Sequence, residues 1–173
     1  SNLARLALAE GHEVAVLDDL STGYAENLTE HGIPLALDFH EGSILDSQAL
    51  ASAMAKADTV IHLAALGSVP RSITDPITSH LANATGTLMV LEAARAAGVG
   101  HIVSASSSSV YGMNPALPKG EREWVRPMSP YAASKLATES YALAWQHSYD
   151  MPTLAFRFFN VFGPLQAAGH AYA

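Results

Sequence analysis

The chain has 173 residues, of which 49% are hydrophobic and 14% are charged, and its formal net charge at pH 7 is −7. This length predicts about one domain with a sizeable core, and the apolar composition excludes a disordered chain. The acidic balance and the scattered basic residues argue against a nucleic-acid partner and against binding to an anionic membrane surface.

Cysteine is absent from the sequence, which excludes disulfide bonds and thiolate chemistry and fits a reducing compartment. No apolar run approaches the roughly 18 residues that a membrane span needs, and no signal peptide is visible. We therefore expect no membrane partner and a cytoplasmic location. The eight histidines show no metal-ligand spacing, so we expect no metal site, and His62, inside a predicted strand, is expected to be a satisfied core group.

The first half of the chain alternates helical patterns with short apolar runs. Residues 1–12 are predicted to form the later part of a helix that ends at a glycine. Residues 13–20 predict a buried strand that ends in two aspartates, and residues 33–42 predict a second strand. A helix over residues 46–57 follows, with an aspartate as its N-terminal cap.

The second half continues the alternation. It predicts strands over residues 58–66, 101–106 and 152–163, a long amphipathic helix over residues 78–97, and a helix that starts at Ser129. Apolar strands that alternate with helices are typical of a parallel sheet covered on both faces. Right-handed crossovers then give a doubly wound, Rossmann-like α/β domain.

Ligands of such a sheet bind outside the carboxyl ends of its strands. Asp18 ends the first predicted strand, where a dinucleotide fold places a carboxylate on the adenosine ribose hydroxyls. A carboxylate there also repels a 2′-phosphate, so it predicts NAD rather than NADP. The alternative is that Asp18 caps a turn in "DDLSTG", and the local pattern leaves both open.

The Gly-rich phosphate loop and the strand that should precede this unit are missing from the sequence. We expect the natural polypeptide to begin about a dozen residues earlier. The missing strand would lie between the strands that carry Asp18 and Leu63. We therefore expect the chain alone to bind NAD weakly or not at all, and to close the gap by rearranged pairing or self-association.

Serine, tyrosine and lysine side chains suggest a catalytic set. Four serines, Ser106 to Ser109, follow a buried strand, and Tyr131 and Lys135 are four residues apart on one predicted helical face. A phenol with a reference pKa of about 10 is a poor base at neutral pH, but a nearby ammonium favours the phenolate. A serine hydroxyl can then orient the alcohol that loses its proton.

Six motifs occur in order: "VLDDLSTG", "VIHLAALGSVPRSITDP", "NATGTLMVLEAARAAGV", "SASSSSVYG", "SPYAASK" and "RFFNVFGP". Together they resemble the extended short-chain dehydrogenase/reductase superfamily, in its NAD-dependent nucleotide-sugar epimerase/dehydratase branch. The resemblance covers essentially the whole chain and is strongest to UDP-sugar 4-epimerases. It implies an NAD-binding domain over residues 1–173 that is partial, because relatives continue into the rest of the substrate-binding region.

The resemblance also implies the site residues. Ser107 matches the catalytic hydroxyl, Tyr131 the general base and Lys135 its partner, which also holds the nicotinamide ribose. The implied cofactor contacts, besides Tyr131 and Lys135, are Asp18, Asp19, Leu20, Ser21, Thr22, Gly23, Ser43, Ile44, Leu63, Ala64, Ala65, Gly67, Asn83 and Phe159. Ser43 stands where the family usually has an aspartate. The implied contacts with a UDP-sugar substrate are Ser68, Ser107, Ser109, Tyr131 and Asn160.

The residues after Ser107 favour one reaction within the branch. Dehydratases place an Asp-Glu pair there, whereas this chain has Ser108 and Ser109. The absence of a carboxylate favours oxidation and re-reduction at C4, which is epimerase chemistry. The alternatives are a dehydratase, a decarboxylase or a reductase of the same branch, or an inactive, cofactor-free fragment. The resemblance also implies a homodimer.

Overall fold

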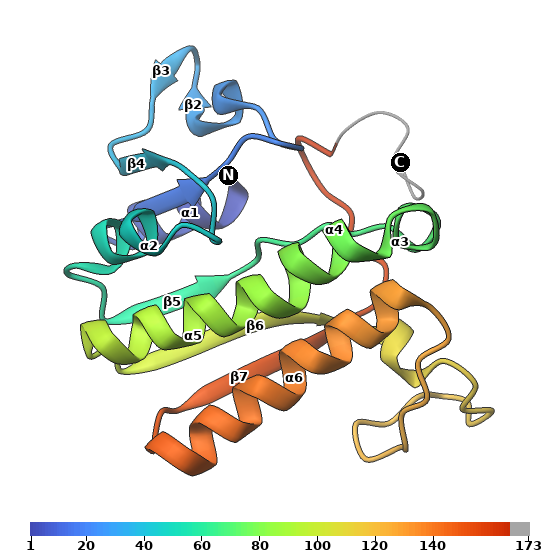
Figure 1. The fold of residues 1–173 in the computed structure, drawn as a ribbon. Helices are drawn as coiled ribbons and strands as arrows, with labels where there is room; N and C mark the ends of the chain where they lie inside the picture. The colour runs from blue at the N-terminus through green and yellow to red at the C-terminus, as the bar shows by residue number, and fades with distance from the viewer. Residues whose placement is uncertain (167–173) are drawn as a thin grey trace.

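The computed structural model describes residues 1–166. Helices and strands alternate along the chain (Figure 1). The helical segments are α1 (Asn2–Ala9), η1 (Ala25–Leu28), α2 (Ser47–Met54), α3 (Val69–Thr74), α4 (Pro76–His80), η2 (Leu81–Thr85), α5 (Gly86–Ala97), η3 (Ser108–Tyr111) and α6 (Pro130–Tyr149). The strands are β1 (Ala15–Asp18), β2 (Thr29–Glu30), β3 (Ile33–Pro34), β4 (Asp38–Glu41), β5 (Thr59–His62), β6 (His101–Ser107) and β7 (Thr153–Phe158).

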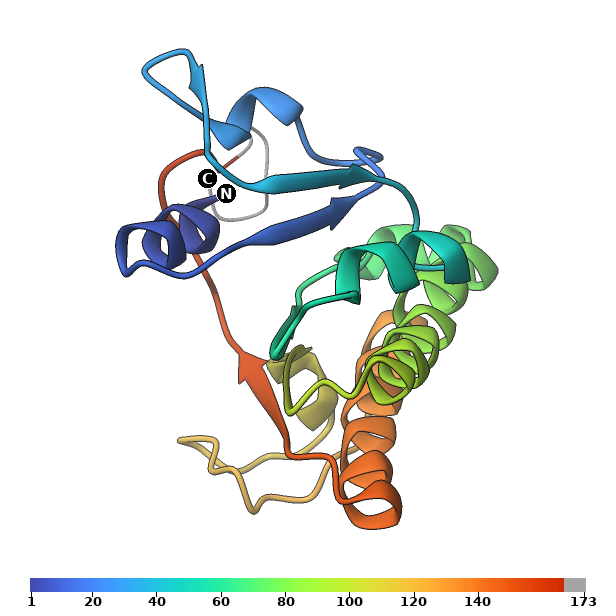
Figure 2. The ribbon, with the colours of Figure 1, turned by 90° about the vertical axis from the view of Figure 1, so that its left-hand side faces the viewer.

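The strands form two parallel sheets and one small hairpin. Strand β1 pairs with β4, β5 pairs with β6 and β6 with β7, all in parallel, while β2 and β3 are antiparallel. Within residues 1–166, β1 and β5 do not pair, and Figure 2 shows the β1–β4 sheet set apart from β5. The α/β, Rossmann-like class is confirmed. The expected rearranged pairing across the gap is absent between β1 and β5 within residues 1–166.

Local sequence signals explain most helix boundaries. Asp46 accepts hydrogen bonds from the backbone of Gln48 and Ala49, so the predicted cap of α2 is confirmed. Gly98, with a φ of 72°, ends α5 in the left-handed conformation that glycine adopts without strain. The predicted glycine stop after the first helix is also present, as Gly11 with a φ of 87°.

Two predicted elements differ from the structure. The strand predicted over residues 33–42 is two separate strands, β3 and β4, because β3 pairs back on β2 in a hairpin. The helix predicted over residues 78–97 begins earlier, at Pro76, where Asp75 caps it, and it contains the π-helical turn η2. The helix α3 was not predicted at all.

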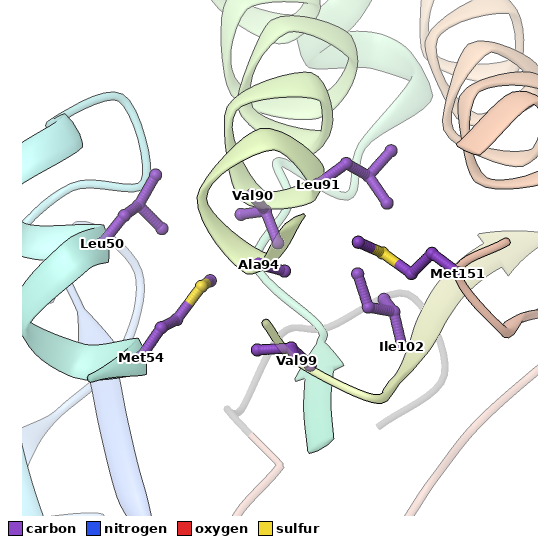
Figure 3. Packing of buried hydrophobic residues seen from close by; sticks show 8 residues of the cluster. All are labelled: Leu50, Met54, Val90, Leu91, Ala94, Val99, Ile102 and Met151. Atoms are coloured by element: carbon purple, nitrogen blue, oxygen red, sulfur yellow. The ribbon is translucent and has the colours of Figure 1, made fainter. Parts of the chain in front are cut away.

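A compact apolar cluster joins α2 and α5 to the start of β6. Eight buried side chains form it (Figure 3): Leu50, Met54, Val90, Leu91, Ala94, Val99, Ile102 and Met151. Helix α5 supplies its apolar face at helical spacing, which is why this helix lies along the sheet rather than in solvent. The cluster therefore fixes the strands whose carboxyl ends form the site.

Only one face of the β5–β6–β7 sheet is covered within the described residues. Helix α6 lies against β6 and β7, and α5 against β5 (Figure 1). On the opposite face Ile61, Leu154 and Phe156 are 44–46% exposed, so the prediction of cover on both faces is wrong for this sheet. The pleat alternates side chains between the faces. Ser106 is therefore buried and its partner on β7, Arg157, is half-buried, whereas Phe158, the partner of Ser107, is exposed.

No helix of the described chain is both long and apolar enough to cross a membrane.

Candidate active site

The first turn of α6 carries Tyr131 and is fixed at two points. Ser129 caps the helix by accepting a 3.1 Å hydrogen bond from Ala132 N, so the predicted start of α6 is confirmed. The backbone amide of Tyr131 donates a 3.0 Å hydrogen bond to Ser72 Oγ on α3. Ser72 is fully buried, so α3 holds the tyrosine's backbone in place.

Lys135 lies one turn further along the same face of α6. Its Nζ donates a 2.8 Å hydrogen bond to the carbonyl oxygen of Ala105 on β6, and the residue is only 5% exposed. Burial lowers the pKa of this ammonium to about 8. The group is therefore mostly charged at pH 7, at the carboxyl end of β6, where it bonds to the residue two positions before Ser107.

Ser107 ends β6 and begins η3. Its Oγ accepts hydrogen bonds from the backbone amide of Ser109 at 3.2 Å and from Ser109 Oγ at 2.9 Å. These bonds hold the Ser107 hydroxyl at the strand end, and α6 packs against both β6 and η3. The structure thus brings the helix of Tyr131 and Lys135 against the strand that carries Ser107.

Asn83 lies in the π-helical turn η2 and is 1% exposed. Its Oδ1 accepts from Leu66 N at 2.7 Å, and its Nδ2 donates to Leu66 O at 3.2 Å and to Ser134 Oγ at 2.9 Å. Asn83 therefore holds the segment after β5 against α6. Its direct contact with a cofactor stays a prediction, since its side chain is already engaged.

Asp18 is exposed at the carboxyl end of β1. Its Oδ1 accepts a 2.8 Å hydrogen bond from Leu20 N, and Asp19 Oδ1 accepts one of 3.0 Å from Ser21 N. The turn-capping interpretation is therefore confirmed, and it is compatible with a ribose contact because the carboxylate remains exposed. A Cβ on Gly23 would be 3.7 Å from Asp18 Oδ1, so this glycine lines the same carboxylate.

The other predicted contacts also lie at or near strand ends. Ser43 Oγ accepts from Leu45 N, and the side chain of Ile44 packs against Gly86. Ser68 caps α3 by accepting from Arg71 N. Exposed or half-buried positions after β1, β5, β6 and β7 are occupied by Ser21, Thr22, Leu63, Ala64, Ala65, Gly67, Ser109, Phe159 and Asn160.

His62 is a core group, as predicted. It is buried at the end of β5, and its Nε2 lies 3.0 Å from Thr87 Oγ1, which in turn lies 3.1 Å from Thr138 Oγ1. Burial, and then the charge of Lys135, lower the pKa of His62 to about 4. Among residues 1–166, no group of three or more His, Asp or Glu side chains could hold a metal ion.

Two charged residues of this region were missed by sequence reasoning. Glu139 and Arg157 form an ion pair beneath the strand ends, with 2.9 Å between Arg157 Nη2 and Glu139 Oε2. A signal was present for each: Glu139 continues the face of Tyr131 and Lys135 after another four residues, and Arg157 interrupts an otherwise apolar strand.

Comparisons with known proteins identify the family of the chain. The family model described as "NAD dependent epimerase/dehydratase family" matches residues 1–173. The chain belongs to this family. A UDP-glucose 4-epimerase from Mycolicibacterium smegmatis is 43% identical over 169 residues, which are 96% of this chain and 54% of the relative.

Solved structures give the same result. A UDP-N-acetylglucosamine 4-epimerase from Methanobrevibacter ruminantium, in complex with UDP-N-acetylmuramic acid, aligns with a TM-score of 0.88 and 36% identity over 96% of this chain and 53% of its own. A dTDP-glucose 4,6-dehydratase from Streptomyces venezuelae, solved with NAD bound, aligns with a TM-score of 0.88 and 34% identity. The alignment covers 95% of this chain and 53% of the dehydratase. The chain thus spans about half the length of these family members, which include both epimerases and dehydratases.

The residues present fit NAD along the carboxyl edge of the strands. Asp18 offers an exposed carboxylate at one end, and Leu63 and Phe159 offer apolar side chains that are 52% and 60% exposed. A flat ring placed over such side chains removes apolar surface from water. Lys135, buried beside β6, supplies a cation close to the strand end that carries Ser107. The predictions that Asp18 contacts the adenosine end and that Lys135 and Phe159 contact the nicotinamide end are compatible with this placement.

Proposed function

We propose that the full-length protein is an NAD-dependent UDP-hexose 4-epimerase. The observation that carries the proposal is the placement of Lys135, a buried ammonium on the face of α6 that also carries Tyr131, bonded to the strand that ends in Ser107. The family and its epimerase members support the reaction class, while the UDP-sugar comes from what those relatives bind.

Each residue of the set has a separate task. Tyr131, as the phenolate, takes the proton of the C4 hydroxyl and later returns it. The Lys135 ammonium stabilises that phenolate electrostatically, and its bond to Ala105 O keeps it in place. Ser107 orients the sugar oxygen by a hydrogen bond. NAD, held by Asp18 at its adenosine end and by Lys135 at its nicotinamide end, would supply the reversible hydride transfer at C4 that inverts this carbon.

The lack of a free carboxylate near Ser107 favours epimerisation over dehydration. Elimination of water requires an acid and a base in addition to the tyrosine, and residues 108–111 contain no carboxylate. The nearby acid, Glu139, is occupied on both oxygens by Arg157 and on one by Ser106. It is therefore bound in a structural network and not free to exchange protons with a sugar.

Two other functions are distinguished by simple measurements. A dehydratase, decarboxylase or reductase of the same family would convert a nucleotide sugar irreversibly or consume reduced cofactor. A cofactor-free, inactive protein would contain no NAD after purification. The epimerase instead interconverts two sugars with no net change of NAD.

We also propose that the protein is a homodimer in the cytoplasm. Ile73 and Ile77 are 65% and 69% exposed, and Ile77 lines a mostly apolar groove with Pro76, Ala133 and Ala137 between α4 and α6. A second copy would cover this surface. Sedimentation of the full-length protein tests the dimer: a monomer at all micromolar concentrations contradicts it.

The proposed reaction is tested directly with the full-length protein. UDP-glucose, UDP-galactose and their N-acetylated forms are each incubated with the protein, and the C4 epimers are separated by chromatography. Epimer formation without added cofactor, with NAD released on denaturation, is the expected result. A 4-keto-6-deoxy product, or no product from any of the four, contradicts the proposal.

A further inference from the structure

A buried ionic network lies directly beneath the proposed catalytic residues. Glu139 on α6 is 6% exposed. Its Oε1 accepts a 2.5 Å hydrogen bond from Ser106 Oγ and a 2.9 Å bond from Arg157 Nε, and its Oε2 accepts a 2.9 Å bond from Arg157 Nη2. Glu139 thereby joins α6 to the end of β6 and to β7. The pKa of Arg157 is raised, chiefly by its bonds to Glu139.

A second set of contacts surrounds the guanidinium. Arg157 Cζ lies 4.9 Å from the centre of the buried Tyr111 ring, and Arg157 Nη1 donates to the carbonyl of Glu121. Tyr111 Oη donates to the carbonyl of Gly120. Bidentate pairing with a carboxylate needs the planar guanidinium, which can also stack on the face of an aromatic ring. Arg157 is thus held from η3, from α6 and from the loop that leads to α6.

The network shares its elements with the catalytic set. Tyr131, Lys135 and Glu139 follow one another at intervals of four residues, so they lie on one face of α6. Ser106 directly precedes Ser107 on β6, and the pleat turns their side chains to opposite faces. The bond between Glu139 and Ser106 therefore fixes how far along β6 the helix sits.

We propose that Glu139 is a positioning residue, which holds Tyr131 and Lys135 in register with Ser107 through its bonds to Ser106 and Arg157. A buried ion pair is a weak source of net stability, because desolvation of the charges offsets much of their attraction. Its directional bonds nevertheless define one geometry. A small sliding of α6 along β6 would increase the distance between the Tyr131 phenol and the Ser107 hydroxyl. Proton transfer is sensitive to such a change in geometry.

This inference rests on the proposed function for its kinetic readout, and the surface of α5 offers a matched control. Arg95 and Glu92 form the same bidentate pair, with Nε to Oε1 at 3.0 Å and Nη2 to Oε2 at 2.9 Å, but both side chains are nearly half exposed. The substitutions Glu139→Gln and Glu92→Gln therefore make the same chemical change, one beneath the site and one at the surface.

The kinetic test uses full-length protein with each substitution, and measures kcat, KM, NAD content and thermal midpoint. We expect Glu139→Gln to lower kcat at least fivefold with KM within threefold and NAD content unchanged, and Glu92→Gln to leave all four unchanged. Ser106→Ala, a milder change, should lower kcat at least threefold in the same way. A smaller loss in kcat, or a loss that merely follows the loss of NAD or folded protein, overturns the proposal.

A second readout is independent of the reaction. Hydrogen exchange of the amides of residues 131–135 should be faster in Glu139→Gln than in wild type, and unchanged in Glu92→Gln. If these amides exchange at the wild-type rate in Glu139→Gln, the positioning role is overturned, even where activity is lost. If wild type has no epimerase activity, the proposed function fails, and the exchange result alone decides the role of Glu139.

Discussion

Lys135 Nζ donates a 2.8 Å hydrogen bond to the carbonyl oxygen of Ala105, across the contact between α6 and β6. The bond satisfies one of the three ammonium protons in a place where the residue is only 5% exposed. A buried ammonium is costly, because water no longer solvates the charge. The protein therefore holds a charge at this strand end at the expense of stability.

That cost predicts an unusual effect of Lys135→Met. The lowering of the lysine pKa from 10.5 to about 8 corresponds to roughly 3 kcal/mol against the charged form. At pH 7 nearly all of this penalty is present, and it disappears as the pH rises from about 8 to above 10. We expect Lys135→Met to abolish turnover yet to raise the free energy of unfolding at pH 7 by about 1–3 kcal/mol, after loss of the Ala105 bond. Denaturant unfolding at pH 7 and pH 10 measures the free energy of unfolding, with the exposed Lys56→Met as control. A Lys135→Met protein that is less stable than wild type at pH 7 contradicts the argument.

Tyr131→Phe tests the proposed base. The change removes only the phenol oxygen, so we expect a loss of far more than tenfold in kcat, which exceeds about 1.4 kcal/mol in barrier, with little change in thermal midpoint. Tyr141→Phe, on the same helix, is the control and should leave both kcat and the thermal midpoint unchanged. Retention of more than a tenth of the wild-type rate by Tyr131→Phe is incompatible with the assignment.

Asp18 is expected to select NAD over NADP. Its carboxylate is exposed at the end of β1 and repels a 2′-phosphate while accepting hydrogen bonds from ribose hydroxyls. Dissociation constants of both cofactors are measured for wild type and Asp18→Ala, with Asp58→Ala, an exposed aspartate outside the predicted cofactor contacts, as the control. We expect the preference to fall at least tenfold in Asp18→Ala only. Equal wild-type affinities for the two cofactors would remove the ribose-carboxylate argument.

His62 predicts acid sensitivity. Its pKa is lowered from 6.5 to about 4 by burial and by Lys135. Between these two pH values His62 is therefore protonated in the unfolded state but neutral in the folded state. Stability is therefore full above pH 6.5 and falls by roughly 3 kcal/mol as the pH drops through 4. His62→Gln should flatten this slope between pH 6.5 and 4, whereas the exposed His12→Gln should not. An unchanged slope in His62→Gln contradicts the assignment.

The sequence predicted the elements better than their contacts. The caps Asp46 and Ser129 and the alternation of apolar runs identified α2, α6 and the parallel strands, because these signals are local. The division of residues 33–42 depended on pairing with β2, and the exposed face of β7 depended on the rest of the sheet. Neither is encoded in periodicity.

The site shows the same limit. The spacing of Tyr131 and Lys135 is enough to place them on one helical face, because the helical repeat is a local property of the chain. The network around Glu139 that lies beneath them could not be predicted. The partners of Glu139, Ser106 on β6 and Arg157 on β7, are 33 and 18 residues away along the chain. Such long-range pairing depends on how the strands and α6 are aligned with one another, and the local periodicity of the sequence does not reveal this alignment.

The last prediction concerns the 173-residue chain expressed alone. Ile61, Leu154 and Phe156 form an exposed apolar strip across the uncovered face of β5 and β7, and within residues 1–166 β1 and β5 have no partner on their facing edges. Exposed apolar faces and free strand edges recruit other chains. We expect the isolated chain to self-associate in sedimentation at micromolar concentration and to bind NAD weakly or not at all in calorimetry. Leu154→Lys together with Phe156→Lys should reduce the association, while Leu143→Lys, similarly exposed but on α6, should not. A compact monomer that binds NAD with micromolar affinity contradicts both halves of the prediction.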